Sequence, residues 1–147
     1  MSARVQTGDF DLAAELRGFG AGAGAIVTFT GVVRDNRDQN LETMEIEHYP
    51  AMTQRALDGI EAEARARWDL CDCAIIHRYG KLRIGERIMM VATASSHRKD
   101  AFEAAEFLMD YLKSRAPFWK KEITLSGEVW VDSREADEAE LDRWQAD

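Results

Sequence analysis

The sequence has few of the residues on which some protein classes depend. Its 147 residues include two cysteines, Cys71 and Cys73, which are separated by a single residue. A disulfide across that spacing would be badly strained, and two thiols without a third cysteine fall short of a zinc quartet. We therefore interpret both cysteines as reduced thiols that serve packing or lie at the surface.

Long apolar runs and linkers are also missing. No run approaches the roughly 20 apolar residues that span a bilayer. Asp9 and Asp11 stand where a signal peptide would carry basic and apolar residues. No internal repeat and no Pro/Ser-rich linker divides the chain. We therefore expect a cytoplasmic protein in which residues 1–147 form a single domain.

Positive charge is scarce. Lys and Arg number 19 against 27 Asp and Glu, which gives a net charge of −8 and disfavours a general nucleic-acid binder. The cations that are present concentrate before and after a predicted helix: His97, Arg98, Lys99, Lys113, Arg115, Lys120 and Lys121. A local cluster can oppose the net charge, and Phe118 and Trp119 lie beside it. The cluster predicts a pocket for a flat anionic ligand, and we expect neither nucleic acid nor a membrane as a partner.

Hydrophobic periodicity predicts that strands and helices alternate along the chain. The predicted strands are residues 25–33, 41–49, 73–77, 87–93, 122–125 and 128–131. The predicted helices are residues 10–17, 52–68 and 101–114. We expect the first two strands to pair as a hairpin, and the last two to pair around Ser126-Gly127. These pairings favour an α/β or α+β fold, with a mixed, mainly antiparallel sheet and helices packed on it.

Polar residues and a proline mark the helix ends. Asp9 is the expected N-cap of the first helix, and Asp100 with Glu103 forms a predicted capping box for the third. Pro117 disfavours helical geometry at the residue before it and so ends the third helix. The glycine-rich residues 18–24 precede a strand instead of following one. We therefore interpret them as a flexible connector and not as a dinucleotide-binding loop.

Two lysines are candidates for a catalytic role. Lys113 lies in the last turn of the third predicted helix, where the helix dipole alone would favour a cation by about 0.3–1 kcal/mol. That account does not extend to Lys120, which lies beyond Pro117 and beside Trp119. From the residues alone, function and ordinary surface charge explain this pair equally well.

Candidates for anion binding lie at two strand ends. His97 and Arg98 occupy a strand-to-helix junction, where free backbone N–H groups and the helix dipole attract anions; a solvated basic turn is the alternative. Arg34 closes the first predicted strand, and a surface charge is the commoner explanation for such an arginine. No His, Cys or carboxylate set at ligand spacing stands out, and no Ser-His-Asp arrangement. We therefore predict neither a metal nor a cofactor.

Five segments, in their order along the chain, resemble one family: VTFTGVVR, EHYPAMT, IHRYGKLRIGE, SSHRKDAFEA and MDYLKSRAPFWKKE. Together they cover roughly residues 25–135 and are similar to the MoaE family, the catalytic large subunit of molybdopterin synthase. The most specific of them has Lys113, two further residues and then Ala-Pro-Phe-Trp-Lys. The charged tail, residues 136–147, resembles nothing functional.

The resemblance implies an activity and partners. The family is a sulfurtransferase of molybdenum cofactor biosynthesis, which forms the dithiolene of molybdopterin from cyclic pyranopterin monophosphate. The sulfur arrives as a thiocarboxylate at the C-terminus of a small ubiquitin-like subunit, whose tail inserts into the large subunit. Two large subunits form a central homodimer with one small subunit at each end, a heterotetramer. Each large subunit has an α/β hammerhead fold with an antiparallel sheet.

The resemblance also implies the residues of the site. The catalytic residues would be Lys113 and Lys120. The implied substrate-binding residues are Val32, Val33, Arg34, His97, Arg98, Lys113, Lys120, Lys121, Glu122 and Arg134. The alternative is a non-catalytic module that docks a ubiquitin-like protein through Phe118 and Trp119. A weaker alternative is a nucleotide or RNA binder that stacks bases beside cations.

Overall fold

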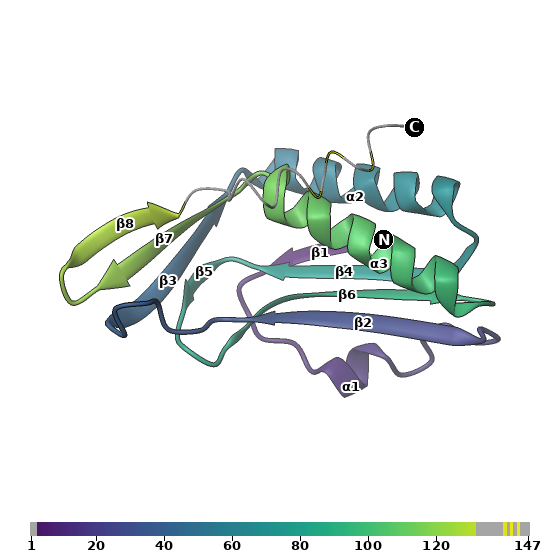
Figure 1. Ribbon diagram of the computed structural model, residues 1–147, viewed down its shortest axis with the longest axis horizontal. Coiled ribbons are helices and arrows are strands. Elements are labelled where there is room, and N and C mark those ends of the chain that lie inside the picture. The colour runs from purple at the N-terminus through teal and green to yellow at the C-terminus, as the bar shows by residue number, and fades with distance from the viewer. Residues whose placement is uncertain (1–2, 132–139, 141, 143, 145–147) are drawn as a thin grey trace.

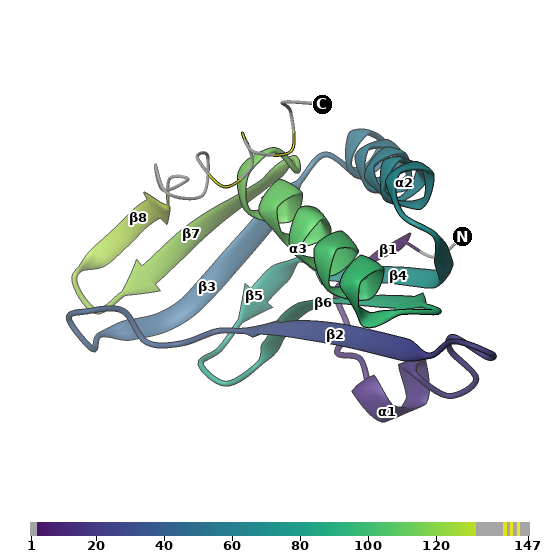
Figure 2. The same ribbon diagram turned by 45° about the vertical axis from the view of Figure 1, so that its right-hand side comes forward.

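The computed structural model describes residues 3–131, 140, 142 and 144. Along this part of the chain, Figure 1 shows β1 (Ala3–Gln6), α1 (Leu12–Glu15), β2 (Ala25–Val32), β3 (Leu41–His48), α2 (Pro50–Arg67), β4 (Leu70–Arg78), β5 (Gly80–Leu82), β6 (Arg87–Ser95), α3 (Arg98–Ser114), β7 (Phe118–Thr124) and β8 (Gly127–Val131). Helices α2 and α3 cover one face of the sheet that contains β6, and α1 lies on the other face (Figures 1 and 2). None of the described helices is long and apolar enough to cross a membrane.

The described strands form two sheets. Their orders are β1-β4-β6-β2 and β5-β3-β7-β8. Strand β1 runs parallel to β4, and the other neighbouring strands are antiparallel. The predicted class, an α/β fold with mixed, mainly antiparallel strands, is confirmed. The predicted single sheet is divided in two, and the segment between β2 and β3 crosses from one sheet to the other.

The expected hairpin of residues 25–33 with residues 41–49 is wrong. Strand β2 pairs instead with β6, in a register that places Ala25 opposite Ser95 and Val32 opposite Arg87. Strand β3 pairs with β7 and β5. A short polar turn is compatible with a hairpin, but the continuous apolar strand β6 needs a neighbour on each side, and β4 and β2 provide them.

The last hairpin forms as predicted. Strands β7 and β8 pair antiparallel, with Thr124 opposite Gly127 at the turn. The hydroxyl of Thr124 donates to the Gly127 carbonyl oxygen over 2.9 Å, and Gly127 has φ 134°, a backbone conformation that favours glycine. Strand β7 begins at Phe118, four residues earlier than predicted, so the Phe-Trp-Lys-Lys segment belongs to a strand.

The helix ends differ from the predicted caps. Asp11, and not Asp9, caps α1 by accepting a hydrogen bond from the backbone N–H of Ala13. Helix α3 begins at Arg98 with His97 as its N-cap, so there is no capping box. Asp100 instead accepts the backbone N–H of Asp69. Asp100 thus has a tertiary partner, which a local sequence pattern cannot indicate.

Strand β6 lies at the centre of the core. Its residues 88–95 are all buried, and α2 and α3 cover one face with Leu57, Phe107 and Leu108. On the opposite face Phe10 packs near Met90 in a smaller cluster. The hydroxyl of Thr93 donates to the carbonyl oxygen of Ala101 over 2.7 Å and so fixes α3 to the strand. Because α3 is held in this way, its C-terminal end projects toward the second sheet (Figure 2).

Candidate active site

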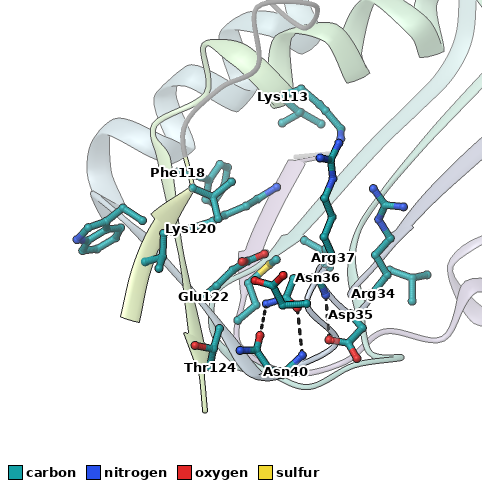
Figure 3. A pocket seen from close by; sticks show the side chains of 18 of the residues that line it. Arg34, Asp35, Asn36, Arg37, Asn40, Lys113, Phe118, Lys120, Glu122 and Thr124 are labelled. Carbon is teal, nitrogen blue, oxygen red and sulfur yellow. Dashed lines mark hydrogen bonds between the residues drawn. The ribbon is translucent and has the colours of Figure 1, made fainter. Parts of the chain in front are cut away.

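A pocket of about 1040 Å³ lies where the end of α3 meets the second sheet. Its walls come from the end of β2, the loop of residues 33–40, the last turn of α3, and strands β7 and β8. Figure 3 shows the labelled side chains of this pocket. A volume of this size is at the upper end of the range for small-molecule sites.

Strand β7 directs alternate side chains into the pocket. Phe118, Lys120, Glu122 and Thr124 line it, as the period of two in a strand requires. Trp119 faces away and contacts Tyr49 edge to face, with ring centroids 4.9 Å apart. The alternation therefore separates a pocket face, which carries Lys120, from an aromatic outer face.

The two candidate catalytic lysines lie in the same pocket. Lys113 is in the last turn of α3 and Lys120 is the third residue of β7, and both line the cavity. The chain reverses between them at Ala116 and Pro117, which ends the helix and starts the strand. Residues seven apart in the sequence are thus brought to the same cavity, which two lysines line.

A buried histidine lies behind Phe118 and does not itself line the pocket. Phe118 stacks on His77 with ring centroids 3.7 Å apart and planes 15° apart. The Nδ1–H of His77 donates to the Arg78 carbonyl oxygen over 2.8 Å. Burial lowers the pKa of His77 to about 3, and the nearby charges of Lys120 and His48 lower it further, against the opposing effect of that hydrogen bond. His77 is therefore neutral at physiological pH, and its uncharged ring supports one face of Phe118.

A second histidine, His48, also lies close to Phe118. Its ring is 4.3 Å from that of Tyr79 and 5.9 Å from that of Phe118. Burial also lowers the pKa of His48, and its Nδ1 is 3.0 Å from the hydroxyl oxygen of Thr53. Because burial lowers the pKa of both histidines, neither adds a positive charge behind Phe118 near neutral pH.

The end of β2 and the loop after it supply the opposite wall. Val32 and Arg34 line the pocket. Val33 does not line it, because its side chain is buried in the core. The backbone of Val33 instead fixes the strand end: its N–H donates to the Glu86 carbonyl oxygen, and its own carbonyl accepts the N–H of Gly85.

Arg37 is among the pocket residues that the sequence reasoning missed. Arg37 lies on the loop between β2 and β3, a segment to which no function was assigned, and it lines the pocket with Arg34. In Figure 3 both arginine side chains extend from this loop into the cavity. The sequence shows a second arginine three residues after Arg34, but it does not show that this side chain faces the pocket.

Two other predicted residues lie away from the cavity or outside the described part of the chain. The ammonium of Lys121 is 3.0 Å from Glu128 and 3.9 Å from Glu45 and sits over the ring of Trp130. The carboxylate of Glu128 raises the pKa of Lys121. Lys121 does not line the pocket, and its role in binding stays a prediction. Arg134 lies outside the described residues.

His97 and Arg98 are not brought to the lysines within one chain. Both are exposed at the N-terminal end of α3, and Lys113 is in its last turn. Fifteen residues of helix separate Arg98 from Lys113, a distance of about 22 Å at 1.5 Å per residue. A single chain therefore cannot place both on one small substrate.

Within the described residues, no group of three or more His, Cys, Asp or Glu side chains could hold a metal ion.

Known proteins are similar to this chain in sequence and in fold. A sequence model of the MoaE protein family matches residues 5–115. The molybdopterin synthase catalytic subunit of Cereibacter sphaeroides is 61% identical over 147 residues, which cover 98% of this chain and 100% of that protein. The corresponding subunit of Ralstonia nicotianae is 54% identical over 145 residues, 96% of this chain and 82% of that protein.

Solved structures of similar fold belong to proteins of the same kind. The molybdopterin biosynthesis MoaE protein from Burkholderia ambifaria superposes with a TM-score of 0.83 at 52% identity and covers 99% of both chains. Molybdopterin synthase from Staphylococcus aureus gives 0.81 at 32% identity and covers 86% of this chain and 94% of that one. Fold and site thus define an α/β protein with a cation-lined pocket at the junction of two sheets. The chain belongs to the MoaE family, which confirms the predicted resemblance.

Proposed function

We propose that the chain is the catalytic subunit of molybdopterin synthase. It transfers sulfur from the C-terminal thiocarboxylate of a small ubiquitin-like subunit to cyclic pyranopterin monophosphate, which becomes the dithiolene of molybdopterin. The observation that carries this proposal is the position of Lys113 and Lys120 in one pocket, in a chain that is 61% identical to a molybdopterin synthase catalytic subunit. A docking surface alone does not need two lysines inside a cavity.

The pocket suits a planar anionic substrate. Phe118 offers an aromatic face, held in place by its stack on His77, and Arg34 offers charge-assisted hydrogen bonds to a phosphate. The ammonium groups of Lys113 and Lys120 can stabilise oxyanions that develop at the thiocarboxylate carbon. One of them can also shuttle protons if its pKa is lowered as substrate excludes water.

The sulfur donor is proposed to enter the same pocket. The tail of a small ubiquitin-like subunit is a narrow extended segment, and a cavity of about 1040 Å³ can hold its end beside a pterin. A related solved structure is a complex of subunits 1 and 2 of the molybdopterin-converting factor from Helicobacter pylori. At 20% identity that likeness supports the fold, and the partner of the present chain is part of the proposal.

Assembly into a homodimer, and with two small subunits into a heterotetramer, would explain the position of His97 and Arg98. These residues lie about 22 Å from Lys113 along α3. We propose that they serve the pocket of a second copy, where a substrate can reach both. Both cysteines are free thiols, as a reducing compartment would keep them, and we propose that the enzyme acts in the cytoplasm.

The test is reconstitution of the reaction. Purified protein, thiocarboxylated small subunit and cyclic pyranopterin monophosphate are mixed, and molybdopterin is measured by the fluorescence of its oxidised derivative. Lys120→Ala should abolish product while circular dichroism and binding of the small subunit stay unchanged. Lys81→Ala, an exposed lysine on β5, is the matched control and should keep full activity. Near-normal turnover by Lys120→Ala would refute the assignment, and tight partner binding without product from the unmodified protein would leave a docking module.

A further inference from the structure

The loop between β2 and β3 presents a second arginine to the pocket. Arg34 and Arg37 both line the cavity. In Figure 3 the Arg37 side chain extends from the loop toward Lys113, and Arg34 runs beside it. The loop wall therefore contributes two guanidinium groups, whereas the β7 wall contributes Phe118 and Lys120.

Hydrogen bonds hold the loop that carries Arg37. The Asp35 carboxylate accepts the backbone N–H of Asn36 over 2.9 Å and that of Leu41 over 3.0 Å. The side chains of Asn36 and Asn40 are joined over 2.8 Å, and the Asn36 side-chain oxygen accepts the backbone N–H of Asn40 over 3.1 Å. Asn40 in turn donates to the hydroxyl of Ser126 in the β7–β8 turn over 3.0 Å. Arg37 thus extends from a backbone that is tied to the opposite side of the pocket.

The cations of this wall have no partner in the described part of the chain. No hydrogen bond or ion pair to described residues engages the side chains of Arg34, Arg37 or Lys113. Three carboxylates, Asp35, Asp38 and Glu122, also line the pocket, but no ion pair joins any of them to these cations within the described residues. The carboxylates offset part of the repulsion among the cations that share this cavity, and a bound anion would offset more of it. An arginine keeps its charge at any physiological pH and presents a planar fork that matches a phosphate.

We propose that Arg37 is a further substrate-binding residue, which together with Arg34 holds the phosphate of cyclic pyranopterin monophosphate. This inference rests on the proposed function. With the pterin ring against Phe118, the phosphate faces the loop wall. Opening of the cyclic diester yields a monoester that carries up to one more negative charge at pH 7, so a second fixed guanidinium becomes more useful as the reaction proceeds.

The test compares kinetic constants for the two substrates separately. In Arg37→Ala, the apparent KM for cyclic pyranopterin monophosphate should rise about tenfold, the factor that corresponds to about 1.4 kcal/mol, with kcat nearly unchanged. Arg37→Lys should recover only part of the loss, because an ammonium cannot form the bidentate contact. The apparent KM for the thiocarboxylated small subunit should stay at the wild-type value. Arg55→Ala, an exposed arginine on α2 away from the pocket, is the matched control and should behave as wild type.

Two outcomes would overturn the inference. An unchanged KM for the pterin in Arg37→Ala removes the residue from the phosphate site. An increase confined to the KM for the small subunit would assign Arg37 to the partner's tail instead. Calorimetric titration of cyclic pyranopterin monophosphate into wild type and Arg37→Ala keeps this test separate from turnover. If the wild-type protein makes no molybdopterin, the proposed function fails; if wild type turns over and the variant binds the pterin equally well, only the role of Arg37 fails.

Discussion

Acid should destabilise this protein through His77 before most of its carboxylates titrate. His77 is 2% exposed and stacked on Phe118, and its pKa falls from an ordinary 6.5 to about 3, chiefly because of burial. The unfolded chain therefore binds one more proton than the folded chain between these two values. The stability from a neutral His77 is fully present above pH 6.5 and is lost as the pH falls from 6.5 toward 3.

The size of the effect follows from the shift. Each pH unit below 6.5 costs about 1.4 kcal/mol for one proton, so acidification from pH 6.5 to pH 5 should remove about 2 kcal/mol of unfolding free energy. With a urea m-value of about 2 kcal/mol/M, the midpoint should move down by about 1 M. Burial also lowers the pKa of His48, so a smaller contribution of the same sign adds to this loss.

The assay is urea unfolding followed by tryptophan fluorescence at several pH values from 7 to 5. His77→Phe keeps an aromatic ring against Phe118 but cannot be protonated, so its stability should fall less steeply with acid than that of wild type, by about 1.4 kcal/mol per pH unit. Ile75→Val, at a fully buried neighbour, should cost about 0.5–1.5 kcal/mol at every pH and keep the wild-type slope. Equal slopes for wild type and His77→Phe would refute the reasoning.

Two further predictions concern α3. Arg98→Ala should raise the apparent KM for cyclic pyranopterin monophosphate without changing the urea midpoint, because this exposed residue is proposed to contact substrate in the pocket of a second copy; an unchanged KM would exclude it from the site. Leu108→Ala should lower the unfolding free energy by about 2–5 kcal/mol, because Leu108 is fully buried between α3 and the sheet; a loss below about 1 kcal/mol in urea unfolding would show that the core repacks around the deletion.

Local patterns predicted the local structure. The 3.6-residue period located α2 and α3, and the Ser126-Gly127 turn located the β7–β8 hairpin. Helix starts were less accurate: α3 begins three residues before its predicted start, at Arg98. Strands β1 and β5 were not predicted, because four and three residues are too few to show a period. Their positions depend on the neighbours to which they bond.

The site was predicted in part. The motif around Lys113 and Lys120 identified two residues that line one pocket, and Arg34 joins them there. Arg37 could not be separated from the other polar residues of its loop, since nothing in a turn sequence indicates which side chains face a cavity. The structure also shows that His97 and Arg98, which seemed part of the same basic cluster in the sequence, lie at the far end of a helix from Lys113.

By itself the sequence determined where the longer helices and strands lie, where the last hairpin turns and which chemical groups are available, because each of these depends on residues close together in the chain. Tertiary structure decided which strands pair and which cations share a cavity. Ala25 lies opposite Ser95 and Leu41 opposite Thr124, and such pairings are selected by the apolar surface that the whole fold buries. The pocket exists because those distant pairings bring the end of β2, the end of α3 and the start of β7 to one place.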